Sequence, residues 1–196
     1  MQAQPDGSTK VLAPAGMMLS ALCNTAQKES LAGLEFAFGI PGTVGGAVYM
    51  NAGAYGGELK DVLESVRVMT SDGEVKRAKR KNWIWDYRHS CIPERGYIVL
   101  SARIRLEKGD PEAIRVRMDE LAAKRREKQP LEYPSAGSTF KRPELFRRKI
   151  DRRCRTSRLS GGGAQVSEKH CGFVINRDLR RLRTSRGCVG RCRARV

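Results

Sequence analysis

Long apolar runs are missing from this sequence of 196 residues. A helix needs about 20 consecutive apolar residues to cross a bilayer, and no stretch comes near that length, so we expect no membrane span and no membrane partner. The first six residues, MQAQPD, lack the basic start and apolar run of a secretory signal. With 40% hydrophobic residues, the chain can still bury one good core or two small domains.

Regular metal-ligand spacings are absent as well. No CxxC pair occurs, Cys188 and Cys192 are the only close pair of cysteines, and His170 is too isolated to complete a convincing zinc set. The six cysteines follow no regular spacing: Cys23, Cys91, Cys154, Cys171, Cys188 and Cys192. The pattern indicates scattered thiols in a reducing cytoplasm, and we predict no metal.

The net charge of +17 is concentrated in one part of the chain. Residues 141–196 hold 18 basic and 4 acidic residues, whereas residues 1–140 hold 20 basic and 17 acidic ones. A basic tail suggests a nucleic-acid-binding protein as an alternative function. The tail, however, has no aromatic residues interleaved for base stacking and no recognisable reader module. We therefore expect no specific nucleic-acid partner.

Strands and helices are mixed along the chain without regular alternation, which predicts an α+β fold. Apolar spacing predicts helices over residues 16–32 and 111–128, the second with Ile114, Met118, Leu121 and Ala122 on one face. Two β-rich runs around Asp72-Gly73 predict a hairpin over residues 64–78, and residues 97–106 alternate like a strand. The run 107–110 is the best domain boundary.

Six glycines lie within residues 39–56, GIPGTVGGAVYMNAGAYG. Backbone N–H groups of glycine can approach an anion without a Cβ in the way, so this segment can cradle a pyrophosphate. It lacks the lysine of a P-loop and the GxGxxG spacing of a Rossmann turn. On glycine content alone, a tight buried turn explains the segment as well as phosphate binding does.

The longer string GLEFAFGIPGTVGGAVYMNAGAYG, with AGMMLSAL before it and ELKDVLESV after it, resembles the flavin-binding core of the UDP-N-acetylenolpyruvoylglucosamine reductase family. The resemblance implies that backbone amides of the loop hold the pyrophosphate of FAD. The residues so implied are Gly39, Ile40, Gly42, Thr43, Val44, Gly45, Gly46, Asn51, Ala52 and Gly53.

Two further strings follow in the order of that family. DYRHS, residues 86–90, is similar to its YRxS, and PSAGSTFKRP, residues 134–143, is similar to its AGSxFKxP. Alone, Arg88 would be a surface cation and Ser138 a local hydrogen bonder. Together, the strings imply that Arg88 and Ser138 are catalytic and that Tyr87 and Lys141 bind substrate, and we predict that Tyr87, Arg88 and Ser138 converge on one cleft facing the glycine segment.

The reaction that the resemblance implies explains these residue types. A hydride passes from NADPH through FAD to the β-carbon of UDP-N-acetylglucosamine enolpyruvate, in a bacterial cytoplasmic enzyme expected to be a monomer. A guanidinium suits the carboxylate on which charge develops, because it makes two parallel hydrogen bonds and stays protonated. The resemblance implies that Ser138 then protonates the α-carbon, yielding UDP-N-acetylmuramate.

The resemblance also predicts the domain organisation. We expect a partial FAD-binding domain of the vanillyl-alcohol-oxidase/PCMH-like type over residues 1–109 and a partial α+β substrate-binding domain over residues 110–196. An upstream flavin segment and a glutamate near the C-terminus, both present in the family, have no counterpart here. We therefore expect the chain as written to be truncated and inactive.

Residues 144–160 and 178–196 lose the resemblance, which returns at GGAQVSEKHCGFVIN, residues 162–176. Codons can be chosen for residues 145–160 that, shifted by one base, read YFAGKLIDDAGLQGY, text of the kind the family has here. The two stretches are therefore predicted to be out of frame and poorly ordered.

Overall fold

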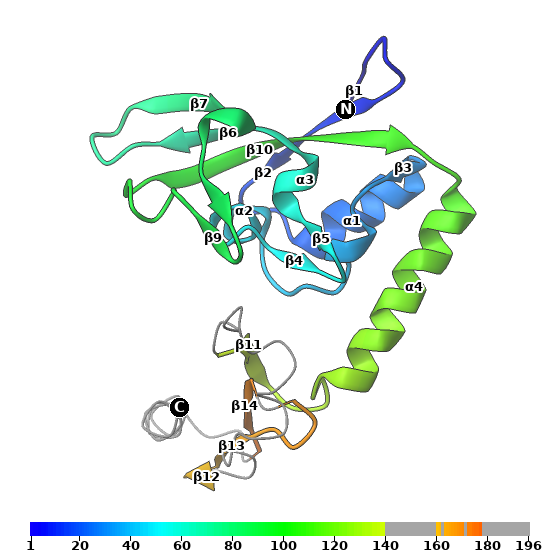
Figure 1. The fold of residues 1–196 in the computed structure, drawn as a ribbon, viewed down its shortest axis with the longest axis vertical. Helices are drawn as coiled ribbons and strands as arrows, with labels where there is room; N and C mark the ends of the chain where they lie inside the picture. Colours follow the sequence, from blue (N-terminus) through cyan, green and yellow to red (C-terminus); the bar gives the residue numbers. More distant parts are fainter. Residues whose placement is uncertain (140–159, 162, 171, 178–196) are drawn as a thin grey trace. The chain divides into compact units, whose positions relative to one another are not determined.

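A six-stranded antiparallel sheet forms the frame of the first of two units, Met1–Ala123, in this computed structural model (Figure 1). The structure describes residues 1–139, 160–161, 163–170 and 172–177. The strands run in the order β1, β2, β10, β6 and β7, and β3 pairs with the far end of β10. Their bounds are β1 Gln2–Ala3, β2 Thr9–Pro14, β3 Leu31–Ala32, β6 Leu63–Met69, β7 Val75–Lys79 and β10 Ile98–Lys108.

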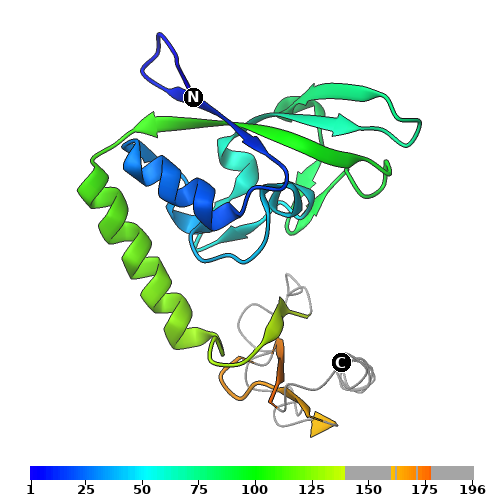
Figure 2. The ribbon, with the colours of Figure 1, turned by 180° about the vertical axis from the view of Figure 1, so that it is seen from behind.

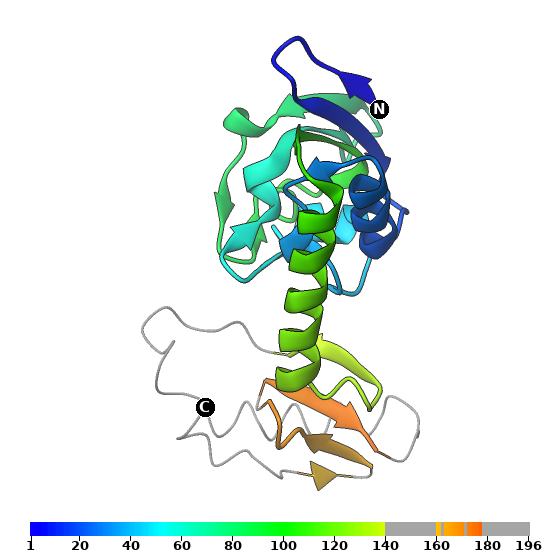
Figure 3. The same cartoon turned by 90° about the vertical axis from the view of Figure 1, so that its right-hand side faces the viewer.

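Three helices of this unit lie on the same side of the sheet (Figures 2 and 3). They are α1 Leu19–Lys28, α2 Val44–Tyr49 and α3 Leu59–Val62. Alternation along β2 explains the arrangement, because Val11 and Ala13 are buried whereas Leu12 between them is 59% exposed. The inward residues pack against the apolar face of α1, which buries Leu19, Leu22, Cys23 and Ala26.

The segments between the main strands and helices contain several short elements. Two small hairpins are formed by β4 Gly53–Ala54 with β5 Gly57–Glu58, and by β8 Trp85–Asp86 with β9 His89–Ser90. Two single-turn 3-10 helices are η1 Glu35–Ala37 and η2 Arg80–Asn82. The glycine-rich segment 39–56 is therefore not loop throughout, since it contains the six-residue helix α2 and the strand β4.

The second unit, Lys124–Val196, contains a four-stranded antiparallel sheet in the order β11, β14, β13, β12. The strands are β11 Ser135–Ser138, β12 Ser160–Gly161, β13 Ala164–Val166 and β14 Phe173–Asn176. Helix α4, Pro111–Lys128, crosses the division between the units. Its residues Ile114 and Met118 belong to the core of the first unit. The domain boundary predicted at residues 109 and 110 stays a prediction.

Each element predicted from periodicity is confirmed. The expected helix 16–32 is the shorter α1, and the helix 111–128 is α4 with Ile114, Met118 and Leu121 buried. The Asp72-Gly73 hairpin joins β6 to β7, with Gly73 at a φ of 86°. The expected poor order of residues 144–160 and 178–196 falls, except for Ser160, outside the described residues. None of the described helices is long and apolar enough to cross a membrane.

Burial of Cys23 in this core leads to a prediction about its thiol. Its Sγ donates to Leu34 O at 3.5 Å, and burial raises the pKa of the thiol from 9.0 to about 12. The unfolded chain therefore loses this proton at a lower pH than the folded protein does. The contribution to stability is complete below about pH 9 and is lost as the pH rises towards 12.

We expect the free energy of unfolding, from urea titrations at a series of alkaline pH values, to fall more steeply with pH in the wild type than in Cys23→Ala. Iodoacetamide at about pH 8 should alkylate Cys23 in the urea-unfolded chain much faster than in the folded one. Equal slopes in the two proteins would contradict the assignment.

Candidate functional site

The turn before α2 leaves several backbone N–H groups without an acceptor among the described residues. Gly39 and Gly42 are exposed and have φ of 80° and 124°, conformations that side chains rarely adopt. No heavy atom lies within 4 Å of where a Cβ on Gly42 would stand. Among the described residues, the backbone N–H groups of Gly39, Gly42 and Thr43 have no acceptor. Backbone N–H groups without an acceptor can donate to an anionic oxygen, and the pyrophosphate role of these three residues stays a prediction.

The next backbone amides have partners within the protein. Val44 N donates to Met17 O at 2.8 Å, and Gly45 N donates to Ala15 O at 2.9 Å. Gly46 N donates to the hydroxyl of Thr43, which caps α2. The backbone N–H groups of Ile40, Asn51 and Ala52 are bonded to Ala37 O, Val48 O and Ala47 O. The cofactor role of these residues stays a proposal, and the structure gives them a part in shaping the turn.

Gly45 has a packing reason to be glycine. A Cβ there would stand 2.9 Å from Ala15 Cβ and 3.2 Å from Ala15 O. The turn therefore lies directly against the chain that leaves β2. This contact sets the distance between the glycine segment and the central sheet.

Asn51 is fully buried at the end of α2, and its side chain joins three segments. Its Nδ2 donates to Glu58 Oε2 at 3.1 Å and to Asp86 O at 3.0 Å, and its Oδ1 accepts from Lys60 N at 3.0 Å. Its φ of 43° lies in the left-handed region, which asparagine tolerates better than most residues. The glycine segment, the start of α3 and the DYRHS hairpin are thereby held together.

Arg88 lies over the same segment. Its Nη2 donates to Gly53 O, its Nη1 donates to Asn51 O at 3.5 Å, and Nη1 also lies 3.7 Å from Glu58 Oε1. The guanidinium stands 4.8 Å from the centre of the Tyr87 ring, a cation–π contact. The Arg88 side chain is 27% exposed. The structure thus brings the predicted catalytic arginine and Tyr87 together with two predicted cofactor residues.

The backbone of Arg88 has a φ of 52°, in the left-handed region. Such a residue typically costs about 1 kcal/mol or more and persists where surrounding contacts hold it. The hairpin β8–β9 supplies those contacts. Ser90 Oγ donates to Tyr49 O at 2.6 Å and so fastens the hairpin to α2, beside which β9 lies (Figure 1).

Gly53 is glycine because other groups fill the place of its side chain. A Cβ would stand 2.5 Å from Gly57 O, 2.9 Å from Glu58 Cγ and 3.1 Å from Arg88 Nη1. Its N–H and C=O belong to the β4–β5 hairpin and to the contact with Arg88. Gly53 was predicted to bind FAD, and the structure shows in addition that it gives Arg88 and Glu58 room to approach.

Glu58 is the residue that the sequence analysis missed. Its carboxylate accepts from Asn51 Nδ2 and from Asp61 N, the latter in a capping box at the start of α3. It also pairs with Lys60 Nζ at 2.7 Å, and this hydrogen bond raises the pKa of the lysine. The spacing Glu58-x-x-Asp61 is a signal for the capping box. No local pattern indicates the contacts to Asn51 and Arg88, which come from other elements.

In the second unit, Ser138 ends β11, where it pairs with Phe173 of β14. Thr139 N donates to Gly172 O at 2.7 Å, and Gly172 N donates to His170 Nδ1 at 3.1 Å. A Cβ on Gly172 would stand 2.9 Å from Ser138 Oγ and 3.0 Å from His170 Cε1. The hydroxyl of Ser138 and the imidazole of His170 therefore flank the same glycine.

Two predictions about the site remain predictions. Lys141 lies outside the described residues. The convergence of Tyr87, Arg88 and Ser138 on one cleft concerns both units, each of which is described by itself. No group of three or more metal-ligating side chains occurs among the described residues.

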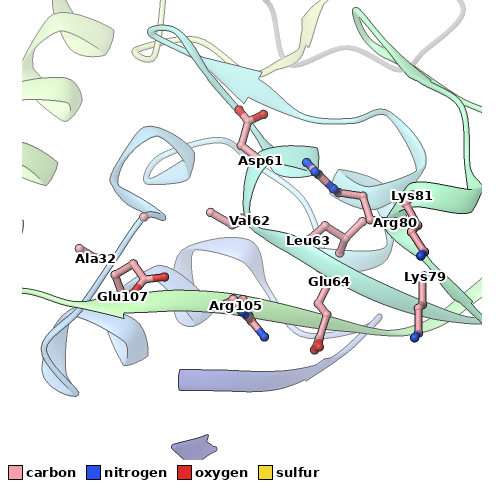
Figure 4. A pocket seen from close by; sticks show the side chains of 11 residues that line it. Ala32, Asp61, Val62, Leu63, Glu64, Lys79, Arg80, Lys81, Arg105 and Glu107 are labelled. Atoms are coloured by element: carbon pink, nitrogen blue, oxygen red, sulfur yellow. The ribbon is translucent and has the colours of Figure 1, made fainter. Parts of the chain in front are cut away.

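A cavity of about 450 Å³ in the first unit contains none of the predicted site residues. Lys79, Arg80 and Lys81 line one end of it, and Ala32 and Glu107 line the other (Figure 4). Arg80 Nη1 donates to Lys60 O at 2.8 Å. The predicted flavin residues lie elsewhere in the unit, around α2 and β4, and Tyr87 and Arg88 lie in the β8–β9 hairpin.

Comparisons with known proteins identify the families that this chain matches. Residues 3–79 match the family described as FAD binding domain, and residues 129–196 match the C-terminal domain of UDP-N-acetylenolpyruvoylglucosamine reductase. The second match includes residues 144–160 and 178–196, so the proposed change of frame there stays a question for resequencing the DNA.

The chain is similar to curated reductases of that name. It is 59% identical to the Agathobacter rectalis protein over 168 residues, 85% of this chain and 54% of that protein. It is 53% identical to the Clostridium novyi protein over 172 residues, 86% of this chain and 55% of that protein. The chain therefore spans about half the length of these relatives.

A solved structure has the same fold. The crystal structure of UDP-N-acetylenolpyruvylglucosamine reductase from Thermus caldophilus matches with a TM-score of 0.83 and 33% identity, over 95% of this chain and 69% of that one. Together with the two matching families, this supports the predicted α+β fold, with an FAD-binding domain followed by the C-terminal domain of the reductase family.

The crowding around Gly53 predicts the effect of adding a methyl group there. Gly53→Ala should lower the free energy of unfolding by about 1–3 kcal/mol. The new Cβ would push away Gly57 O and the guanidinium of Arg88. Gly16→Ala is the matched control, since no heavy atom lies within 4 Å of its added Cβ. Chemical denaturation of both variants measures the difference, and equal stability would contradict the packing described here.

The crowding around Gly172 predicts a local change in the second unit. Gly172→Ala should move the imidazole of His170, because the added Cβ would contact both His170 and Ser138 Oγ. The protein has two histidines, so the ring-proton NMR signals of His170 and His89 can be followed side by side. We expect only the His170 signals to shift. Unchanged signals for His170 would rule out the close approach.

Proposed function

Because the chain belongs to the UDP-N-acetylenolpyruvoylglucosamine reductase family, we propose that its residues serve the reduction of UDP-N-acetylglucosamine enolpyruvate to UDP-N-acetylmuramate, a step in bacterial wall synthesis. The observation that carries the proposal is the position of Arg88. Its guanidinium is held at the carbonyl groups of Asn51 and Gly53, in the same glycine-rich segment whose Gly39, Gly42 and Thr43 N–H groups have no acceptor among the described residues.

FAD, when bound, supplies the transfer of a hydride from NADPH to the β-carbon of the enolpyruvyl group. The backbone N–H groups of Gly39, Gly42 and Thr43 would hold its pyrophosphate. These donors are fixed by the α2 turn, so little reorganisation is needed when an anion binds.

Arg88 would bind the carboxylate of the substrate. When the β-carbon gains a hydride, the electron pair of the double bond moves to the α-carbon and its carboxylate. A guanidinium can make two parallel hydrogen bonds to that carboxylate as its charge increases. Tyr87, beneath the guanidinium, and Lys141 would help to orient the substrate.

Ser138 would donate its hydroxyl proton to the α-carbon, which completes the addition across the double bond. The serine oxygen then regains a proton from solvent. A serine hydroxyl is a weak acid, so the transfer requires the strongly basic carbon that the hydride addition creates. The proposed roles thus separate charge stabilisation by Arg88 from proton donation by Ser138.

The alternative of a basic-tailed nucleic-acid-binding protein gains no support from the relatives, whose names describe reductases. Most of the basic excess lies in residues 141–196, where few residues are described. The cytoplasmic location and the monomeric state stay predictions.

Oxidation of NADPH that depends on UDP-N-acetylglucosamine enolpyruvate, with FAD added, tests the proposal. A version extended to the length of the relatives, with both alternative frames restored, should be active, and the chain as written should not. In the extended version, Ser138→Ala should lower kcat by about 10²- to 10⁴-fold. Arg88→Lys should mainly weaken binding of the substrate's carboxylate, because lysine cannot bind a carboxylate through two parallel hydrogen bonds.

Three outcomes would contradict parts of this account. Equal rates in both versions would show that the altered stretches are dispensable. Absence of substrate-dependent oxidation in the extended version would refute the proposed function. Turnover by Ser138→Ala at the wild-type rate would show that Ser138 is not the proton donor.

A further inference from the structure

Arg88 has two kinds of partner, and they do different things. Gly53 O and Asn51 O accept from its guanidinium and are neutral. The one carboxylate that the described residues bring within 4.0 Å of it belongs to Glu58, with Oε1 at 3.7 Å from Nη1. A neutral carbonyl fixes direction over a short range, whereas a carboxylate attracts the cation from any direction.

Glu58 is itself held in place from several sides. Asn51 Nδ2 and Lys60 Nζ lie 3.1 and 2.7 Å from Glu58 Oε2. In the capping box, the backbone N–H of Asp61 donates to the side chain of Glu58. The pairing of Gly53 with Glu58 in the β4–β5 hairpin keeps its backbone next to the carbonyl that Arg88 binds. The Glu58 carboxylate is therefore a negative charge held in a fixed position beside Gly53.

The separation of 3.7 Å is too long for a good hydrogen bond and short enough for an ion pair. Glu58 therefore attracts the guanidinium without taking up its N–H groups. The side chains of Arg88 and Glu58 are 27% and 20% exposed, so solvent screens their attraction only in part. Arg88 keeps donors for an external carboxylate while its position is biased towards the glycine segment.

We propose that Glu58 is a positioning residue for Arg88: its carboxylate holds the guanidinium over the glycine segment, in place to receive the carboxylate of the substrate. This extends the proposed function, on which its catalytic meaning rests. The contact between Glu58 and Arg88 itself can be tested without flavin or substrate.

The first test uses the chain as it is and follows the reaction of Arg88 with phenylglyoxal by peptide mass spectrometry. Glu58→Gln keeps the size and an acceptor oxygen for Asn51 Nδ2, and removes the charge. The reference within each sample is Arg67, an exposed arginine of β6. Glu64→Gln is the matched control, because Glu64 is 28% exposed and pairs with Lys10 at 2.9 Å, away from Arg88.

Glu58→Gln should raise the modification rate of Arg88 relative to Arg67 by about two- to fivefold, the upper part of the range of ion pairs that solvent can reach. Glu64→Gln should leave that ratio unchanged. Added salt should raise the ratio in the wild type and not in Glu58→Gln, because only the wild type has the ion pair to screen. An unchanged ratio in Glu58→Gln, or an equal rise in Glu64→Gln, would overturn the assignment.

The second test uses turnover in the extended version described above. Glu58→Gln should raise KM for the enolpyruvyl substrate about two- to fivefold and leave kcat nearly unchanged, since the substrate's own carboxylate directs Arg88 once bound. An unchanged KM would refute the positioning role even if the phenylglyoxal ratio rises. Failure of the wild type to turn over would refute the proposed function instead, while the reactivity of Arg88 still decides whether Glu58 holds it.

Discussion

The hydrogen bonds of the buried Asn51 side chain are the constraint on which the rest of the site depends. Its amide is fully removed from solvent, so each of its polar atoms needs a partner inside the protein. Those partners come from the β5 end at Glu58, the start of α3 at Lys60 and the β8 strand at Asp86. One side chain thereby sets the mutual positions of three segments, because leaving any one of them unpaired costs about 1–3 kcal/mol.

Close backbone approach accompanies this network. Gly53 leaves the space that Glu58 Cγ and Arg88 Nη1 occupy, and Gly45 lets the turn lie against Ala15. The glycines of the segment thus serve two purposes that composition does not separate. Gly39 and Gly42 expose backbone donors in conformations unsuited to side chains, whereas Gly45 and Gly53 allow tight packing. A phosphate-binding turn needs both, since its donors must be free and its frame must be rigid.

Sequence reasoning was reliable where a local pattern has a single physical meaning. The alternation along β10, the Asp72-Gly73 turn and the apolar face of α4 each predicted the element that forms. It was less informative at residues 39–56, where glycine content left a buried turn and phosphate binding equally open and did not predict that the chain forms α2 and β4. Glycine is a poor helix former, but here tertiary contacts of Val44, Ala47 and Val48 bury the helix and outweigh that preference.

The amino-acid sequence by itself determined the family, the α+β class and the identity of the residues in the three motifs, because these depend on order along the chain. Only the tertiary structure decided which of them meet. Arg88 contacts Asn51 and Gly53 across more than thirty positions, and Glu58 joins them through a side chain that no motif singles out. Such contacts depend on how α2 and the two hairpins pack under the sheet. Packing of that kind depends on the whole core, so it leaves no signature in any short stretch of sequence.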